Sequence, residues 1–272
     1  PVGTKVVVKG LPYGKYEIKE TAAPQAYLLN GTPITVDATT KSGTVTDTKK
    51  TYSAVVTKTD GIKNVPIAGG LFGLYCTTDI YDYTGTTLLA EKNTVLAIQT
   101  AGTDGKIDFS DVITLLPYGA SYYVLEIEAP QNYLLNNKQL SFTYTTNSAN
   151  GSYTGTLPNL PLGSLSVVKT GDVPKYTFTD KLLTGVTFDA QPLAGAVYEV
   201  YVGEKDIVFD GAVATYTYQG KTITLNKNTL VATLKTDNHG EAVLSALPVG
   251  EYVVKEKAAP NETYLVNVES KK

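Results

Sequence analysis

The stretch "LPYGASYYVLEIEAPQNYLLN" (residues 116–136) decides how this chain is organised, because two further copies of it occur. The other copies are "LPYGKYEIKETAAPQAYLLN" (residues 11–30) and "LPVGEYVVKEKAAPNETYLVN" (residues 247–267). Equivalent glutamates in the first two copies, Glu20 and Glu126, lie 106 residues apart. A period of this length predicts a tandem array of whole domains and not a short-period solenoid.

A second repeated motif sets the domain boundaries. The segment "VVTKTDGIKNVPIAGGLFGLYC" (55–76) corresponds to "VVKTGD" (167–172) followed by "QPLAGAVYEVYV" (191–202). We therefore expect three units: the C-terminal part of a domain at 1–50, a complete domain at 51–163, and a domain at 164–272 whose last strand is missing. This third unit carries insertions at 173–191 and 203–229, which are expected to form surface loops or an added hairpin.

The secondary structure is predicted to be almost entirely β. Alternating apolar and polar residues recur in short runs such as "KVVV" (5–8), "SAVVTKT" (53–59), "YYVLEIE" (122–128) and "EYVVKEK" (251–257). Turn-forming Gly, Pro, Asn and Asp residues separate these runs, and no amphipathic helix of convincing length is found. The sequence therefore predicts an all-β fold.

Composition excludes several classes of function. The chain has 272 residues, a net charge of −3 and no basic stripe, which argues against nucleic acid and against anionic lipid as main partners. Its apolar runs are too short to cross a membrane.

A single Cys, Cys76, cannot form an intramolecular disulfide and is expected to be a buried structural thiol. With one histidine, His239, neither a zinc site nor a Ser-His triad can be assembled, and we expect no cofactor and no metal. Because the chain starts at Pro1 and contains no Met, we expect a processed piece or fragment.

Strand parity places polar residues on apolar faces. Successive side chains of a strand point to opposite faces, so Lys58 shares a face with Ala54 and Val56. By the same rule Glu126 lies with Tyr122 and Val124, and Asn159 lies with Leu157. The other units repeat part of this pattern with the residues Glu20, Asp47, Lys169 and Glu256. An unpaired charge inside a core is costly, so these side chains are expected to meet one another.

Two outcomes of that meeting are open. One is a buried, hydrogen-bonded salt bridge. The other is chemical, because burial favours the neutral form of both an amine and a carboxyl group. A neutral Lys58 could then attack the carboxamide of Asn159, release ammonia and leave a Lys–Asn isopeptide bond, with Glu126 moving the protons. With an aspartate acceptor, water would leave instead. Such a site reacts once and on itself, so it is not a turnover enzyme.

These motifs resemble the Cna B-type (SpaA-like, prealbumin-like) domains of Gram-positive surface adhesins and pilins. The resemblance covers most of the chain and implies tandem Ig-like or prealbumin-like β-sandwich domains with autocatalytic isopeptide bonds. It implies that Lys58, Glu126 and Asn159 are the nucleophile, the acid/base and the acceptor of the middle domain.

The outer units match the family's motif in part. In the first unit Glu20 and Asp47 match the acid and an aspartate acceptor, with the lysine expected before Pro1. In the third unit Lys169 and Glu256 match the nucleophile and the acid, with the acceptor expected after Lys272.

The resemblance implies a structural stalk or pilus-shaft segment on the cell-wall-attached, extracellular surface of a Gram-positive bacterium. Other pilin subunits are then the expected partners. The alternative is an adhesin module that binds a host extracellular protein or glycan through the insertions at 173–191 and 203–229.

Overall fold

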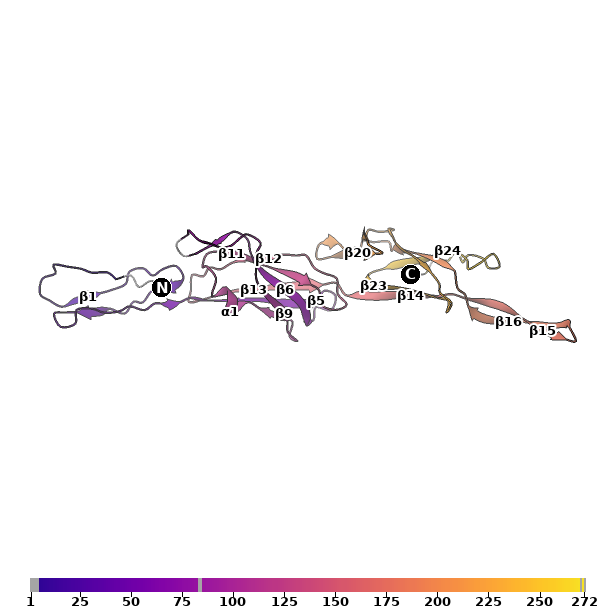
Figure 1. The fold of residues 1–272 in the computed structure, drawn as a ribbon, viewed down its shortest axis with the longest axis horizontal. Helices are drawn as coiled ribbons and strands as arrows, with labels where there is room; N and C mark the ends of the chain where they lie inside the picture. The colour runs from indigo at the N-terminus through magenta and orange to yellow at the C-terminus, as the bar shows by residue number, and fades with distance from the viewer. Residues whose placement is uncertain (1–4, 83–84, 270, 272) are drawn as a thin grey trace.

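The computed structural model describes residues 5–82, 85–269 and 271. The all-β prediction is confirmed: within these residues the single helix is α1 (Ser110–Ile113), four residues long. Among the described residues, no helix has the length and apolarity needed to cross a bilayer. Three β units follow one another along the long axis of the molecule (Figure 1).

The first unit contains four short strands. They are β1 (Tyr16–Ile18), β2 (Tyr27–Leu28), β3 (Ile34–Val36) and β4 (Thr48–Lys49), and they pair antiparallel as β1–β3 and β2–β4. The predicted strand at 5–8 is wrong, because these residues pair with no strand and Val6 is 85% exposed. Alternation of apolar and polar residues can predict a strand only where a neighbouring strand and a core are present to receive it.

The middle unit is a sandwich of two sheets. One sheet has the order β10-β5-β13 and the other the order β12-β11-β6-β9. The strands of these sheets are β5 (Thr51–Asp60), β6 (Gly69–Cys76), β9 (Val95–Ala101), β10 (Lys106–Asp108), β11 (Ser121–Glu128), β12 (Leu140–Thr143) and β13 (Asn150–Asn159). A small hairpin, β7 (Ile80–Tyr81) with β8 (Leu88–Ala90), lies outside the two sheets.

The two sheets enclose a continuous apolar core. Its members include Ala54 and Val56 from β5, Phe72 and Leu74 from β6, and Tyr122, all nearly or fully buried. Cys76 belongs to this core and is a free, buried thiol, as expected of a structural cysteine.

The first and last strands of the middle unit lie side by side. β13 pairs with β5 in parallel over ten residues, from Asn150 opposite Thr51 to Asn159 opposite Asp60. Parallel pairing brings the C-terminal ends of the two strands to the same end of the sheet. The side chains of Lys58 and Asn159 are therefore neighbours although they are 101 residues apart in the chain.

The third unit repeats the central strands of the middle one. β14 (Leu162–Val168) pairs with β23 (Glu241–Pro248), and a second sheet has the order β22-β17-β24. The strands of that sheet are β17 (Val197–Val202), β22 (Leu230–Lys235) and β24 (Tyr252–Ala258). Within the described residues no strand pairs with β14 as β13 pairs with β5, and Lys271 forms only an isolated bridge with Val254.

The insertion at 173–191 forms an added hairpin, as predicted. β15 (Thr170–Thr179) and β16 (Leu182–Pro192) make a two-stranded ribbon that projects from the end of the third unit (Figure 1). Asp180 and Lys181 form its tight turn, and both have positive φ values, which suits a two-residue hairpin loop.

The insertion at 203–229 forms added hairpin structure, as predicted, and buries some of its apolar side chains in the third unit's core. It forms two hairpins from β18 (Val208–Phe209), β19 (Ala212–Val213), β20 (Thr215–Tyr218) and β21 (Lys221–Thr224). Tyr216 and Leu225 of this insertion are buried with Val200 and Val202 of β17.

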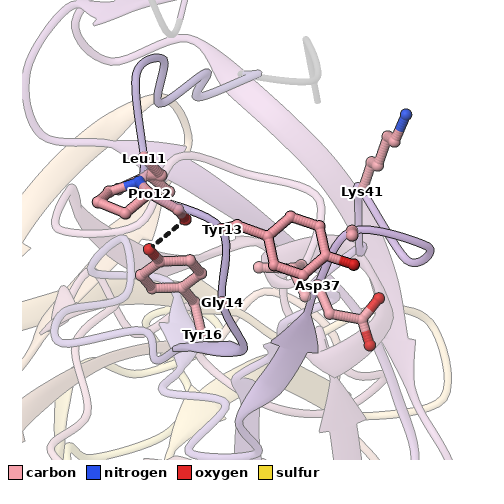
Figure 2. A pocket seen from close by; sticks show the side chains of 9 residues that line it. Leu11, Pro12, Tyr13, Gly14, Tyr16, Asp37 and Lys41 are labelled. Carbon is pink, nitrogen blue, oxygen red and sulfur yellow. Dashed lines mark hydrogen bonds between the residues drawn. The ribbon is translucent and has the colours of Figure 1, made fainter.

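The "LPxG" turn and the tyrosine that follows it have one structural role in all three copies of the repeat. The tyrosine hydroxyl donates a hydrogen bond to the carbonyl of the proline four or five residues earlier in the chain. The three pairs are Tyr16 with Pro12 at 2.6 Å, Tyr122 with Pro117 at 3.1 Å and Tyr252 with Pro248 at 2.7 Å. Figure 2 shows this bond in the first unit. It ties the lead-in turn to the strand that carries the repeated glutamate.

Candidate functional site

Lys58 occupies the centre of the middle unit. It extends from β5 into the core, and its side chain is fully buried. Its Nζ donates hydrogen bonds to the backbone carbonyl of Leu157, at 3.0 Å, and to Oδ1 of Asn159. The same Nζ lies 3.1 Å from Glu126 Oε1 and 5.7 Å from the centre of the Phe72 ring.

Glu126 reaches the same point from the opposite sheet. On β11 it pairs directly with Phe72 of β6, so its side chain faces β5 and β13 across the core. Nδ2 of Asn159 donates to both carboxyl oxygens of Glu126, at 2.9 and 2.8 Å. The side chains of Glu126 and Asn159 are almost completely buried. The parity analysis thus located three polar side chains that the structure brings into one cluster.

Burial makes the neutral amine of Lys58 easier to form than it is for a lysine in water. Burial lowers the pKa of Lys58 from its usual 10.5 to about 8, although the Glu126 carboxylate partly opposes this change by stabilising the ammonium form. A proton can therefore leave Lys58 far more easily than it leaves a lysine in water. Glu126, at 3.1 Å, is the nearest ionisable group that can accept it.

A fourth residue, Asn136, completes the cluster. Its backbone N–H donates to Glu126 Oε2 at 2.7 Å, and its side-chain Nδ2 donates to the carbonyl of Pro158 at 2.7 Å. The sequence analysis gave this residue no part in the site. The signal that could have found it is the asparagine at the end of every copy of the repeat, at positions 30, 136 and 267.

The first unit brings Glu20 and Asp47 together. Burial and the neighbouring Glu20 carboxyl group raise the pKa of Asp47, so Asp47 binds a proton more readily than an isolated aspartate does. Oδ1 of Asp47 has no hydrogen-bond partner among the described residues. The strand that precedes Glu20, β1, is less buried than the corresponding strand of the middle unit, since its Ile18 is 49% exposed.

In the third unit Lys169 and Glu256 form a partly buried ion pair. Nζ of Lys169 lies 2.9 Å from Glu256 Oε1 and 3.0 Å from Oε2. Glu256 also accepts a hydrogen bond from the backbone N–H of Asn267 at 2.8 Å. In the part of the chain that the structure describes, no carboxamide or carboxyl group lies beside Glu256 in the way that Asn159 lies beside Glu126.

The described residues include no cluster of His, Cys, Asp and Glu that could hold a metal ion. A shallow hollow of about 250 Å³ in the first unit, lined by Tyr13, Tyr16 and Asp37 among others, contains none of the candidate residues (Figure 2).

The family model for the SpaA prealbumin-like fold domain matches the chain three times, at residues 2–53, 52–157 and 183–272. The chain belongs to the SpaA prealbumin-like domain family. The recognised family and the predicted tandem prealbumin-like architecture are therefore confirmed. Asn159 and Lys169 fall between the matched ranges, so the geometry is the evidence that places them beside their glutamates.

Several solved structures, pilins among them, are similar to this chain of SpaA prealbumin-like domains. The Bacillus anthracis TIE protein is 21% identical, with a TM-score of 0.43, over 96% of this chain and 39% of that one, so the chain spans about two fifths of that protein. The minor pilin GBS52 of Streptococcus agalactiae is 18% identical over 81% of this chain and 88% of that one, with a TM-score of 0.34.

A mutant of the shaft pilin SpaA from Lactobacillus rhamnosus GG is 15% identical over 82% of this chain and 92% of that one, with a TM-score of 0.32. Comparison with curated proteins gave no match.

Proposed function

We propose that the middle SpaA prealbumin-like domain forms an isopeptide bond between Lys58 and Asn159, assisted by Glu126. We further propose that the chain is a stalk or pilus-shaft segment of a cell-wall-attached surface protein of a Gram-positive bacterium. The observation that carries the proposal is the buried cluster in which the Lys58 amine contacts the Asn159 carboxamide while Glu126 holds the amide nitrogen. A salt bridge between Lys58 and Glu126 alone would not require the Asn159 carboxamide to contact both residues.

The proposed reaction balances within the cluster. Glu126 takes a proton from Lys58, and the neutral amine attacks the side-chain carbonyl carbon of Asn159. Glu126 then returns a proton to the amide nitrogen, which already lies 2.8 Å from Oε2. The C–N bond of the carboxamide breaks and ammonia leaves, while Glu126 takes the second proton from the attacking nitrogen, so that a neutral Lys58–Asn159 amide remains. Nothing else is consumed, and the site cannot act again.

The position of the bond supports a mechanical role. It would join β5 and β13, the first and last strands of the middle unit. β5 begins two residues after the last strand of the first unit, and β14 of the third unit begins three residues after Asn159. A pulling force that enters along β5 would therefore cross the covalent bond and leave along β14, without passing through the rest of the domain.

The contacts between the middle and third units also suit a stalk. Leu160, in the link between the units, is buried in the third unit's core, and Val249 N–H donates to the carbonyl of Pro161 at 3.0 Å. Lys138 of the middle unit forms an ion pair with Asp210 of the third at 3.0 Å. The Phe209 ring covers Gly61 so closely that a Cβ there would lie 2.2 Å from it. These contacts restrict bending at the junction.

The outer units fit the same scheme with partial sets. We propose that Glu20 is the acid/base and Asp47 the acceptor in the first unit, where the raised pKa of Asp47 favours the carboxylic acid that an amine can attack. In the third unit we propose that Lys169 is the nucleophile and Glu256 the acid/base.

Intact mass spectrometry tests the reaction directly. We expect the wild-type chain to be lighter than its sequence mass by one ammonia, and Lys58→Ala, Glu126→Ala and Asn159→Ala to have their full sequence masses. Lys106→Ala, an exposed lysine on the neighbouring strand β10, is the matched control and should keep the loss. A wild-type chain at full sequence mass would leave the cluster as a buried salt bridge and refute the proposed bond.

A second candidate function, adhesion to a host protein or glycan, is favoured by the ribbon β15–β16. One face of the ribbon carries a row of neutral side chains from paired positions, namely Pro174, Tyr176, Phe178, Leu183, Val186 and Phe188. Phe178 and Phe188 are 63% and 64% exposed. Exposed aromatic faces of this kind often mark interaction surfaces.

The ribbon can be tested with a matched pair of faces. If the chain is an adhesin, binding to immobilised host extracellular-matrix proteins or glycans should be lost in the Phe178→Ser, Phe188→Ser double variant. It should persist in Leu182→Ser, which alters an exposed residue on the opposite face of the same ribbon. Binding that survives the double variant, or no binding by the intact chain, would contradict this second function.

A further inference from the structure

The repeat ends in an asparagine whose backbone N–H makes the same contact in each of the three units. It donates to one carboxyl oxygen of the repeated glutamate: Asn30 to Glu20 at 2.9 Å, Asn136 to Glu126 at 2.7 Å, and Asn267 to Glu256 at 2.8 Å. The third unit keeps this bond although its described residues include no acceptor beside Glu256. The contact is therefore a property of the repeat and does not depend on the rest of the cluster.

The side chain of the same asparagine holds the strand that carries the proposed acceptor. Nδ2 of Asn30 donates to the carbonyl of Thr46 at 3.0 Å, and Nδ2 of Asn136 donates to the carbonyl of Pro158 at 2.7 Å. Thr46 and Pro158 are the residues directly before Asp47 and Asn159. Two units with different acceptors, an aspartate and an asparagine, thus have the same link between acid and acceptor strand.

The remaining polar atom of the asparagine fixes its own conformation. Oδ1 accepts a hydrogen bond from the backbone N–H two residues further along the chain, as Asn136 does from Lys138 at 2.9 Å. Asn30 and Asn267 make the equivalent bonds, to Thr32 at 3.1 Å and to Glu269 at 3.0 Å. This local turn holds the side chain in one orientation.

From these contacts we infer that Asn136 is a positioning residue for isopeptide formation, an inference that rests on the function proposed above. It fixes the orientation of the Glu126 carboxyl group and, through Pro158, the backbone that presents Asn159. It takes no part in proton transfer, since its bonds go to Glu126 Oε2, to the Pro158 carbonyl and to Lys138 N–H. Holding reacting groups at a fixed separation and angle lowers the entropic part of the barrier. Asn30 has the same role for Glu20 and Asp47.

The experiment compares three variants of the full chain made by pulsed cell-free synthesis, quenched in acid at set times and weighed intact. Asn136→Ser keeps a hydroxyl oxygen for the turn to Lys138 but is too short to reach the Pro158 carbonyl. Asn136→Asp keeps the turn oxygen and removes the donor. We expect the rate of ammonia loss to fall about three- to tenfold in Asn136→Ser, as for the loss of one hydrogen bond, and at least as far in Asn136→Asp. The adjacent, exposed Asn137→Ser is the matched control and should react at the wild-type rate.

A second measurement separates positioning from a general loss of stability. In the unreactive Lys58→Met chain, the side-chain amide protons of Asn159 are held by Glu126, and their exchange with solvent can be followed by NMR. Adding Asn136→Ser should speed that exchange while the exchange of core backbone amides in β6 stays unchanged.

The outcomes distinguish the two proposals. A wild-type chain that never loses ammonia refutes the isopeptide bond itself. A wild-type chain that reacts, together with an Asn136→Ser chain that reacts equally fast, refutes the positioning role and leaves the bond intact. Faster exchange throughout the core in the Asn136→Ser chain would also refute it, because the residue would then be needed for folding in general.

Discussion

Pulled by its two ends, the wild-type chain should release almost none of its middle unit, whereas Lys58→Ala should release all of it. In a chain linked as proposed, force would pass from β5 to β13 through the Lys58–Asn159 bond, and the segment between these residues, which are 101 positions apart, would carry no load. Without the bond, this segment can be drawn out to roughly 360 Å at about 3.6 Å per residue. Single-molecule force spectroscopy should resolve an extension of that size as one additional step.

The control for this measurement is Lys106→Ala, which changes an exposed lysine of the same unit and should give the wild-type trace. The first and third units contribute equally to both traces, so only the difference between variants is interpreted. A wild-type chain that shows the additional extension at the same force as Lys58→Ala would contradict the proposed load path.

The stability of an unlinked middle unit should rise with pH above 8. Asn159→Ala removes the acceptor but leaves Lys58 buried beside Glu126. The pKa of Lys58 is about 8 in the folded chain and 10.5 when exposed, so between these values the unfolded chain binds more protons. Folding stability therefore increases with pH across that window, by at most about 3 kcal/mol, and the gain is absent below pH 8. Urea unfolding at pH 7.5 and pH 10.5 measures the change.

A second chain isolates the contribution of the lysine. The ordinary pKa of tyrosine, about 10, lies in the same window. The reference is therefore Asn159→Ala combined with Lys58→Met, which contains every other ionisable group of the first variant. The difference between the two chains should grow with pH in favour of the one that keeps Lys58. An equal response of both chains would mean that Lys58 is not desolvated in solution.

Much of the candidate cluster could be predicted from the sequence, because successive side chains of a strand alternate between its two faces. Lys58, Glu126 and Asn159 each share parity with apolar residues, and each is buried in the structure. Parity specifies the face of a strand and nothing about which strands are neighbours. The parallel pairing of β5 with β13, which joins segments about a hundred residues apart, came from the structure.

Asn136 escaped prediction for a different reason. Its contribution depends on a backbone N–H and on an amide that spans two strands, and neither leaves a pattern in hydrophobicity. The same limit explains the wrong strand at 5–8, where an apolar run has no partner strand. It also explains the insertion at 203–229, where an added hairpin was among the predictions but the burial of Tyr216 and Leu225 in the third core was not.

The parallel pairing of β5 with β13 has a further consequence once its two strands are covalently joined. The backbone from Lys58 to Asn159 then becomes a closed ring with the flanking segments attached at neighbouring points. A protease that cuts one exposed loop inside the ring, such as the turn at 61–65, opens the ring without separating the flanking segments. A surface protein built this way can be nicked within the ring and remain in one piece.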